Sequence, residues 1–240
     1  MELGKAQAPD GMRLYAIGDV HGMNAMLAEA HGKIAADLAD RPGLDHRIIH
    51  VGDYVDRGRD SAGVVDRLAR MTASDPRALC LLGNHDEMMR GFLADPLVFG
   101  PSWFANRGAS TVRSYGIDAP DMPDADALPD LAARFAAALP PAHGAFLRDL
   151  PLSVRFGDYF FCHAGIRPGV PLDGQDAHDL VWIREPFLSS TRDHGAVVVH
   201  GHTPGPAPVV RANRIGIDSG AVFGGPLTVL VLEGSDHRFL

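Results

Sequence analysis

The chain has 240 residues and a formal net charge of −8, and 46% of its residues are hydrophobic while 22% are charged. This balance is typical of a globular protein that can bury a substantial core, so disorder of the whole chain is excluded. Lysine and arginine form no long run, which excludes a dedicated nucleic-acid binder that depends on a basic surface.

The two cysteines and the N-terminal segment bear on where the protein resides. Cys80 and Cys162 lie in apolar runs, where free thiols behave as small hydrophobic groups, and they make no disulfide framework. Residues 1–10 lack the apolar segment of a signal peptide, and no apolar run is long enough for a membrane helix. We therefore expect a cytoplasmic protein with no membrane partner, in which residues 1–12 form a flexible extension.

Short apolar runs that end at polar side chains predict buried strands. In chain order they cover residues 13–17, 47–51, 78–82, 158–162 and 196–200. Their apolar residues are continuous rather than alternating, as in strands buried on both faces of a sheet. Helical patterns separate the first three runs: residues 24–38, with Asn24 as the N-cap, and residues 60–71, capped by Asp60–Ser61. The order β-α-β-α-β predicts neighbouring parallel strands joined by right-handed crossovers.

The rest of the chain is less regular. We predict interrupted helices over 85–116, an acidic loop over 117–130, a short helix over 131–139 and two strand-like stretches between 213 and 232. There is no internal repeat and no clear linker, and the residues that bear chemistry come from both ends of the chain. We therefore expect one domain over residues 1–240.

Each strand-like run leads to a potential metal ligand. These ligands, with one more two residues past the first, are Asp19, His21, Asp53, Asn84, His163 and His202. Because ligands gather outside the carboxyl ends of strands in open α/β sheets, we expect these side chains at one sheet edge. Carboxylate, amide and imidazole ligands suit Mn²⁺, Fe or Zn²⁺. Six ligands are too many for one catalytic ion with open positions, so they predict two divalent ions about 3.5–4 Å apart that share a carboxylate.

Each element also has a simpler explanation. A single Gly-Asp-Val-His-Gly segment can be a capped turn, and a lone histidine is more often a hydrogen-bonded core residue. His200 competes with His202 for one role, although we favour a packed position for His200 and for His50. Phe223 either overhangs the site or belongs to a plain β-hairpin. The metal-site interpretation is favoured because the same placement recurs at five strand ends.

In this order, several segments resemble the motifs of the PPP-type metallophosphatases. They are Gly18–Gly22, Gly52–Gly58 and Gly83–Asp86, followed by the two histidine motifs Phe161–His163 and Gly201–His202. The compact length and Trp182–Glu185 are most similar to the bacterial and phage serine/threonine protein phosphatases. The resemblance implies a calcineurin-like α/β fold, in which helices flank a β-sandwich and the site lies at the sheet edge.

The resemblance also implies a division of the metal ligands. Asp19, His21 and Asp53 would hold one ion, and Asp53 would bridge to a second ion held by the remaining ligands, Asn84, His163 and His202. A hydroxide between the ions would attack phosphorus in line. Bound cations would also offset the repulsion between an acidic protein and phosphate.

Further residues match the catalytic groups of the family. Arg57 and Arg184 match its phosphate-binding arginines, which can hold phosphate oxygens bidentately, and Asn84 would join them at the substrate. His85 paired with Asp56 matches its general acid. An acid is needed because a serine or threonine alkoxide is a poor leaving group.

Two departures from the family pattern affect the predicted function. Asp86 stands where protein phosphatases of this family commonly have Glu, and Asp at this place also occurs in dinucleoside tetraphosphate hydrolases, which typically lose the equivalent of Asp56. Arg107 stands where the bacterial members have Gly. The sequence therefore predicts a serine/threonine phosphoprotein phosphatase, with dual specificity open. The alternatives are a dinucleoside polyphosphate or other small-molecule hydrolase and, disfavoured by the complete catalytic set, a scaffold that binds phosphorylated partners without turnover.

Overall fold

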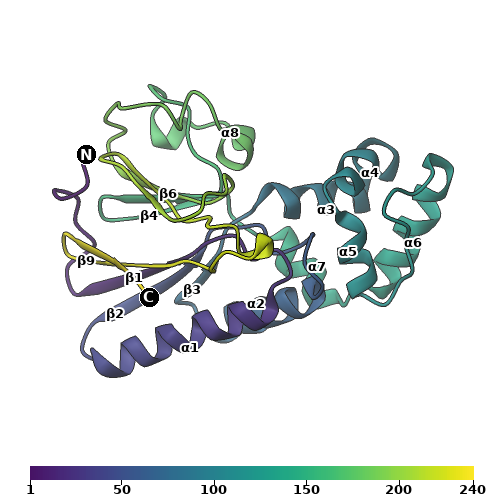
Figure 1. Cartoon of the computed structure of the whole chain (residues 1–240), viewed down its shortest axis with the longest axis horizontal. Coiled ribbons are helices and arrows are strands. Elements are labelled where there is room, and N and C mark those ends of the chain that lie inside the picture. The colour runs from purple at the N-terminus through teal and green to yellow at the C-terminus, as the bar shows by residue number, and fades with distance from the viewer.

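Two five-stranded sheets pack face to face in the computed structural model, which describes residues 1–240 (Figure 1). The first sheet has the order β10-β9-β1-β2-β3, with β1 at Met12–Ile17, β2 at Asp45–His50, β3 at Ala78–Cys80, β9 at Val229–Glu233 and β10 at Asp236–Phe239. The second has the order β4-β5-β6-β8-β7, with β4 at Ser153–Phe156, β5 at Tyr159–Cys162, β6 at Val197–His200, β7 at Val209–Val210 and β8 at Arg214–Gly216.

The predicted β-α-β-α-β unit is confirmed in the first sheet. Strand β1 pairs with β2 and β2 with β3, both in parallel. The expectation that all five strand ends share the edge of one sheet is wrong, because β5 and β6 belong to the second sheet. Apolar periodicity predicts strands, but it carries no information about which strands pair, so it could not divide them between two layers.

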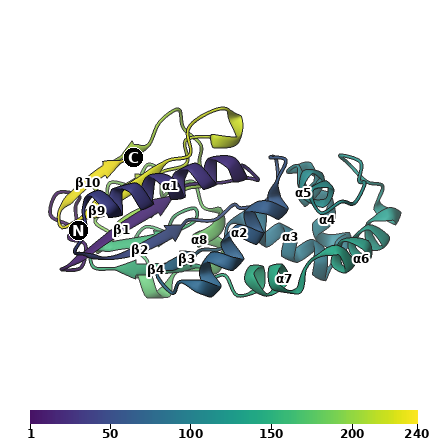
Figure 2. The same ribbon diagram turned by 90° about the horizontal axis from the view of Figure 1, so that it is seen from below.

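Helices α1 (Asn24–Asp40) and α2 (Ser61–Ser74) cover the outer face of the first sheet (Figure 2). The expected cap of α2 is confirmed, since the Asp60 side chain accepts a hydrogen bond from the Gly63 amide. The expected cap of α1 is wrong. Met23 precedes the helix, and the Asn24 side chain instead donates to Asp60 at 2.8 Å.

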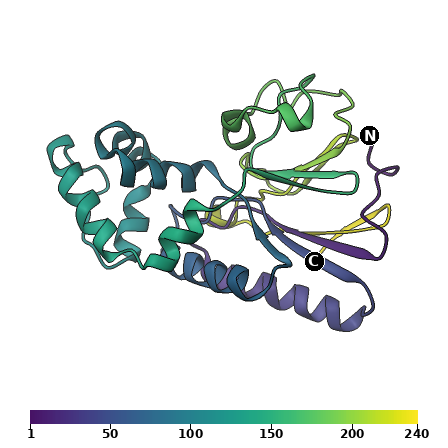
Figure 3. The same ribbon diagram turned by 180° about the vertical axis from the view of Figure 1, so that it is seen from behind.

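A group of helices between β3 and β4 forms a lobe beside the sandwich (Figures 1 and 3). This helical lobe comprises α3 at Asn84–Ala94, α4 at Pro96–Ala105, α5 at Gly108–Ser114, α6 at Leu128–Ala138 and α7 at Pro141–Arg148. The interrupted helices expected over 85–116 are thus confirmed, and the acidic loop ends earlier than predicted because α6 begins at Leu128. A further helix, α8 (Ala177–Trp182), lies over the second sheet.

Strands β1, β5, β6 and β9 are buried on both faces, as expected for continuous apolar runs. Leu14 and Ala16 of β1 face the second sheet, whereas Tyr15 and Ile17 pack toward α1, α2 and the helical lobe. Both cysteines are free and buried. No helix is both long and apolar enough to span a membrane.

The N-terminal segment lies along the sandwich. Ala6 and Ala8 are buried in the core between the sheets, and the Leu3 amide donates to the Ala212 carbonyl at 2.6 Å. These contacts attach part of the segment to the sandwich, while its mobility stays a prediction, as does the single-domain assignment.

Candidate metal centre and active site

The loops that follow β1, β2, β3, β5 and β6 converge at the end of the sandwich that faces the helical lobe (Figure 1). The Asn84 Oδ1 atom lies 2.9 Å from both His163 Nε2 and His202 Nδ1. The two carboxylate oxygens of Asp53 point in different directions, with Oδ1 3.4 Å from His163 Nε2 and Oδ2 3.4 Å from His21 Nε2. The structure therefore brings these predicted ligands into one buried cluster.

Several of the site residues adopt a left-handed backbone that is uncommon outside glycine. The φ angles are 43° at His21, 56° at Asp53, 72° at Asp56, 66° at Arg57 and 66° at His202. Such strained residues persist only where surrounding contacts hold them, and they concentrate at functional sites.

The imidazoles of the cluster present lone pairs to its centre. His21 Nδ1 contacts the Val55 carbonyl at 2.8 Å and His163 Nδ1 contacts the Val51 carbonyl at 2.9 Å. Each Nδ1 must therefore carry the hydrogen, which leaves Nε2 as an acceptor facing the site. Burial lowers the pKa of His21 to about 3 and that of His202 to about 3, so these rings are neutral at neutral pH.

This arrangement fits a bound cation. His163 Nε2 faces Asn84 Oδ1, and both atoms are acceptors when the ring is neutral. Two acceptors in contact repel each other, whereas a cation bound by both atoms makes the same placement favourable. Imidazole and amide oxygen beside a carboxylate also form a donor set suited to Mn²⁺, Fe or Zn²⁺.

The carboxylates lead to the same conclusion. Burial and then the charges of Asp218 and Asp53 raise the pKa of Asp19 well above its usual range. Divalent cations would offset this concentration of negative charge. Asp218 was missed in the sequence, although it follows β8 as the other candidates follow their strands. Its position directly after the short stretch Ile215–Ile217 is the signal in the sequence that could have identified it.

Two groups of side chains lie close enough to hold an ion, and both contain Asp53. One comprises Asp53, His163 and His202, and the other comprises His21, Asp53 and His85. The shared carboxylate is what a two-ion site requires. Asp19 is a member of neither group. Its oxygens accept from the His202 amide, the closer at 3.0 Å, so its place on an ion stays a prediction.

His85 and Asp56 form a buried pair beside this cluster. His85 Nδ1 lies 2.7 Å from Asp56 Oδ2, and the His85 ring stands edge-on to that of His21 with centroids 4.7 Å apart. Because Nδ1 faces Asp56, the other ring nitrogen is free to act toward the site. Burial raises the pKa of Asp56, while its bonds from His85, Thr111 and Trp103 act in the opposite direction.

The two predicted phosphate-binding arginines lie at the border of the cluster. Arg57 contacts His21 Nε2, and its guanidinium carbon lies 5.4 Å from the centre of the Phe223 ring. Arg184 follows α8 and is exposed. Its charge is close enough to contribute to the lowered pKa of His202, although burial is the larger cause.

Phe223 lies in a short turn between β8 and β9 and is 67% exposed. The plain-hairpin alternative is wrong, because β8 and β9 belong to different sheets. The ring instead stands beside Arg57, at the open side of the candidate site.

Asp86 has a structural role that its motif did not reveal. Its carboxylate accepts hydrogen bonds from the backbone amides of Asp53 at 2.9 Å, Tyr54 at 3.0 Å and Gly83 at 3.1 Å. It therefore ties the loop after β2 to the start of α3, and so fixes Asp53 relative to Asn84.

His200 and His50 are packed in the interior, as predicted. His200 contacts the Gly201 carbonyl at 3.0 Å, and its ring stands edge-on to Phe187. His50 contacts His31 at 2.9 Å in the core. Neither side chain faces the ligand cluster.

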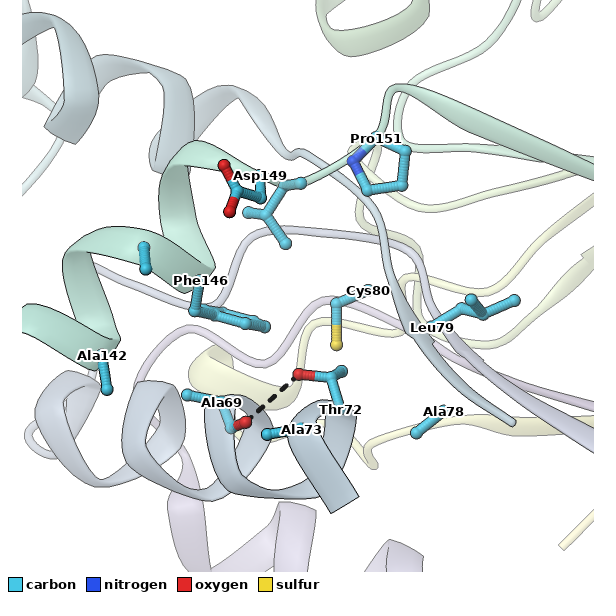
Figure 4. Close-up of a pocket in the computed structure, with 12 residues that line it drawn as sticks. Ala69, Thr72, Ala73, Ala78, Leu79, Cys80, Ala142, Phe146, Asp149 and Pro151 are labelled. Atoms are coloured by element: carbon cyan, nitrogen blue, oxygen red, sulfur yellow. Dashed lines mark hydrogen bonds between the residues drawn. The ribbon is translucent and has the colours of Figure 1, made fainter. Parts of the chain in front are cut away.

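An apolar cavity of about 480 Å³ lies between α2, β3 and α7 (Figure 4). Its walls include Cys80, Phe146 and Thr72, whose hydroxyl hydrogen-bonds within α2. None of the predicted site residues lines it, so it is separate from the candidate active site.

Comparison with known proteins establishes the family. Residues 12–229 match the profile of the calcineurin-like phosphoesterases. The chain belongs to this family. It is therefore a metallophosphoesterase, a class of hydrolase that uses divalent metals.

Relatives of this metallophosphoesterase differ in substrate. Serine/threonine-protein phosphatase 1 of Salmonella typhimurium is 29% identical over 237 residues, which are 95% of this chain and 96% of that protein. The symmetrical bis(5'-nucleosyl)-tetraphosphatase of Bordetella pertussis is 43% identical over 75 residues, which are 30% of this chain and 24% of that protein. The solved structure of a proposed diadenosine tetraphosphatase superposes with a TM-score of 0.65 at 23% identity, covering 98% of this chain and 97% of that one; this likeness shows the fold alone.

Proposed function

We propose that the protein is a phosphoprotein phosphatase that hydrolyses phosphoserine or phosphothreonine, with dual specificity open. The observation that carries the proposal is the 2.7 Å contact between His85 and Asp56 beside a ligand cluster that shares Asp53. A group that only binds phosphate does not need a buried acid pair. The relative matched over nearly its whole length is a serine/threonine-protein phosphatase.

Each catalytic side chain has a distinct task in this proposal. Arg57 and Arg184 bind the phosphate oxygens, with Asn84 beside them, and offset the charge of the transferring group. His85 donates the proton on its free nitrogen to the departing alkoxide oxygen, while Asp56 contacts the opposite nitrogen and orients the ring.

Two divalent ions would complete the site. We propose that Asn84, His163 and His202 hold one, that Asp19 and His21 hold the other, and that Asp53 is shared. When bound, they would lower the pKa of a water molecule and polarise the phosphate. We expect Mn²⁺ to support activity in vitro, with Fe and Zn²⁺ as alternatives. The two buried free thiols support a cytoplasmic location.

Hydrolysis of dinucleoside polyphosphates is the second candidate. Asp86 and the local match to a bis(5'-nucleosyl)-tetraphosphatase favour it. The two functions are separated by measuring kcat/KM for a phosphoserine peptide and for diadenosine tetraphosphate on one preparation with added Mn²⁺. A preference of about 100-fold for the peptide, or about 2.7 kcal/mol in transition-state binding, supports the proposal, and the reverse preference overturns it.

A scaffold without turnover is the third candidate, and the same assay addresses it. Measurable hydrolysis of any phosphomonoester with added Mn²⁺ would eliminate it. Metal analysis that found fewer than two ions per chain would contradict the proposed site.

A further inference from the structure

The carboxylate of Asp56 receives hydrogen bonds from the helical lobe as well as from His85. The Trp103 indole N–H donates to Oδ1 and Oδ2, at 3.1 and 2.9 Å, and the Thr111 hydroxyl donates to Oδ1 at 2.6 Å. Trp103 belongs to α4 and Thr111 to α5. The Asp56 Oδ2 atom, which faces His85 of α3, therefore also accepts a hydrogen bond from Trp103 of α4.

These bonds fix the plane of the carboxylate. A carboxylate with a single partner rotates freely about its last torsion, because that torsion has only broad minima. Asp56 has donors on both oxygens, and Trp103, Thr111 and His85 are all buried. Rotation would break at least one bond and leave a buried donor without its acceptor.

Thr111 also holds the backbone of Asp56. Its hydroxyl oxygen accepts from the Asp56 amide at 2.8 Å, and the Ser61 hydroxyl lies 3.1 Å from the same amide. Asp56 has a left-handed φ of 72°. One hydroxyl therefore contacts both the strained backbone and the carboxylate of the same residue.

The chain around Trp103 is shaped for this contact. A Cβ atom at Gly108 would lie 2.6 Å from the indole ring, so only glycine allows the ring to pack there. Arg107, which precedes it, has a φ of 72°. That left-handed angle explains why glycine is expected at position 107, where this chain has Arg.

We propose that Trp103 and Thr111 are positioning residues for the general acid. By orienting Asp56, they aim the His85 proton at the leaving oxygen of the substrate. This inference rests on the proposed function, in which His85 is the acid. It also gives a role to the buried Trp103 indole N–H, which neither the metal site nor the phosphate-binding arginines explain.

Trp103 has a structural role too, so the variants must separate the two. Its ring packs against Phe92, Phe104 and Phe135 in the helical lobe. Thr111→Val keeps the shape of the side chain but removes the hydroxyl, and Thr111→Ser restores it. Trp103→Phe keeps an aromatic ring and removes the N–H. Thr72→Val is a matched control, because its hydroxyl bonds only within α2.

The test compares two leaving groups in the metal-loaded full chain. A phosphoserine peptide releases an alkoxide that needs an acid, whereas p-nitrophenyl phosphate releases a stable phenolate that does not. We expect Thr111→Val to lower kcat for the peptide by about 10-fold or more, which is part of the roughly 100- to 10,000-fold that a general acid contributes. The same variant should change kcat for p-nitrophenyl phosphate by less than about 3-fold. Trp103→Phe should show the same selectivity, Thr111→Ser should recover most of the lost rate, and Thr72→Val should match the parent for both substrates.

His85→Asn distinguishes failure of this inference from failure of the proposed function. If His85→Asn lowers both rates equally, His85 is not the acid and the proposed function loses its mechanism. If His85→Asn is selective for the peptide but Thr111→Val lowers both rates equally or neither, the positioning role alone is overturned. Variants are compared at equal metal content, so that loss of metal cannot imitate either outcome.

Discussion

Replacing Asp86 tests whether one carboxylate fixes the geometry of the candidate site. The side chain is fully buried and accepts hydrogen bonds from the amides of Asp53, Tyr54 and Gly83. Asp86→Ala removes the acceptor for all of these amides at once. Since the Asp53 amide is among them, the loss reaches the shared ligand of the proposed ions.

The expected cost follows from the number of amides left without a partner. A buried donor that loses its acceptor costs about 1–3 kcal/mol, so three such donors cost about 3 kcal/mol even at the low end of that range. Asp86→Asn keeps one acceptor oxygen but places an amide group against the Tyr54 N–H or its neighbours. We expect this variant to lower the free energy of unfolding by about 1–2 kcal/mol. The free energy of unfolding is measured by urea denaturation in EDTA, which removes any contribution from bound metal.

The control is Asp130→Ala on α6. Asp130 pairs with Arg134 at the surface, and exposed pairs of this kind contribute less than about 1 kcal/mol. If Asp86→Ala lowers the free energy of unfolding no more than Asp130→Ala does, the reasoning is refuted, because the three amides must then find other partners. We also expect Asp86→Ala to weaken Mn²⁺ binding in calorimetric titration, since Asp53 is no longer held.

Three further predictions concern metal, substrate and pH. Asp53→Asn should lower the metal content from two ions to one or none and reduce kcat for p-nitrophenyl phosphate by about 1,000-fold or more, as loss of transition-state stabilisation would require; full activity with two ions bound would exclude the shared role. Arg184→Lys should weaken kcat/KM for the phosphoserine peptide about 10-fold, because lysine cannot bind phosphate bidentately, and an unchanged value would place Arg184 outside the site. Burial lowers the pKa of His50 to about 3, so its contribution to stability is complete above its ordinary pKa and is lost as the pH falls from about 6.5 toward 3. His50→Asn should therefore flatten the fall in unfolding free energy between pH 7 and 5 by about 1 kcal/mol or more, and parallel curves for variant and parent would contradict this assignment.

The strand ends could be predicted because burial leaves a local mark in the sequence. Strands β1, β5 and β6 consist largely of apolar residues, and β2 ends in the apolar pair Ile48–Ile49. Each leads to a polar residue, so the ligands that follow these strands are visible without the structure. Helix α2 is likewise evident from its cap and its apolar face. Strands β7 and β10 could not be predicted from apolar runs, because both are largely exposed and lie at sheet edges.

Contacts between side chains and distant backbone could not be predicted. The partners of Asp86 lie in two loops, and its motif says only that a carboxylate is required. Thr111 meets Asp56 across 55 positions of the chain. Neither residue interrupts a hydrophobic period or forms a turn signal, so their roles depend on the tertiary structure alone.

The chemistry of the leaving group connects these contacts to the choice of substrate. Hydrolysis of a dinucleoside polyphosphate releases a nucleotide through its phosphate oxygen, which leaves readily without a proton, whereas a serine alkoxide must be protonated as it departs. A hydrolase of polyphosphates therefore gains little from a precisely oriented acid. In this chain the proposed acid pair, His85 and Asp56, is buried, and Trp103 and Thr111 from two different helices donate hydrogen bonds to its carboxylate. The segments that carry this network contain left-handed residues at Asp56 and Arg107, each of which costs about 1–3 kcal/mol. Such a cost is understandable if the substrate is an alkyl phosphate, and this favours phosphoserine or phosphothreonine over a dinucleotide even though Asp86 is shared with enzymes that cleave the latter.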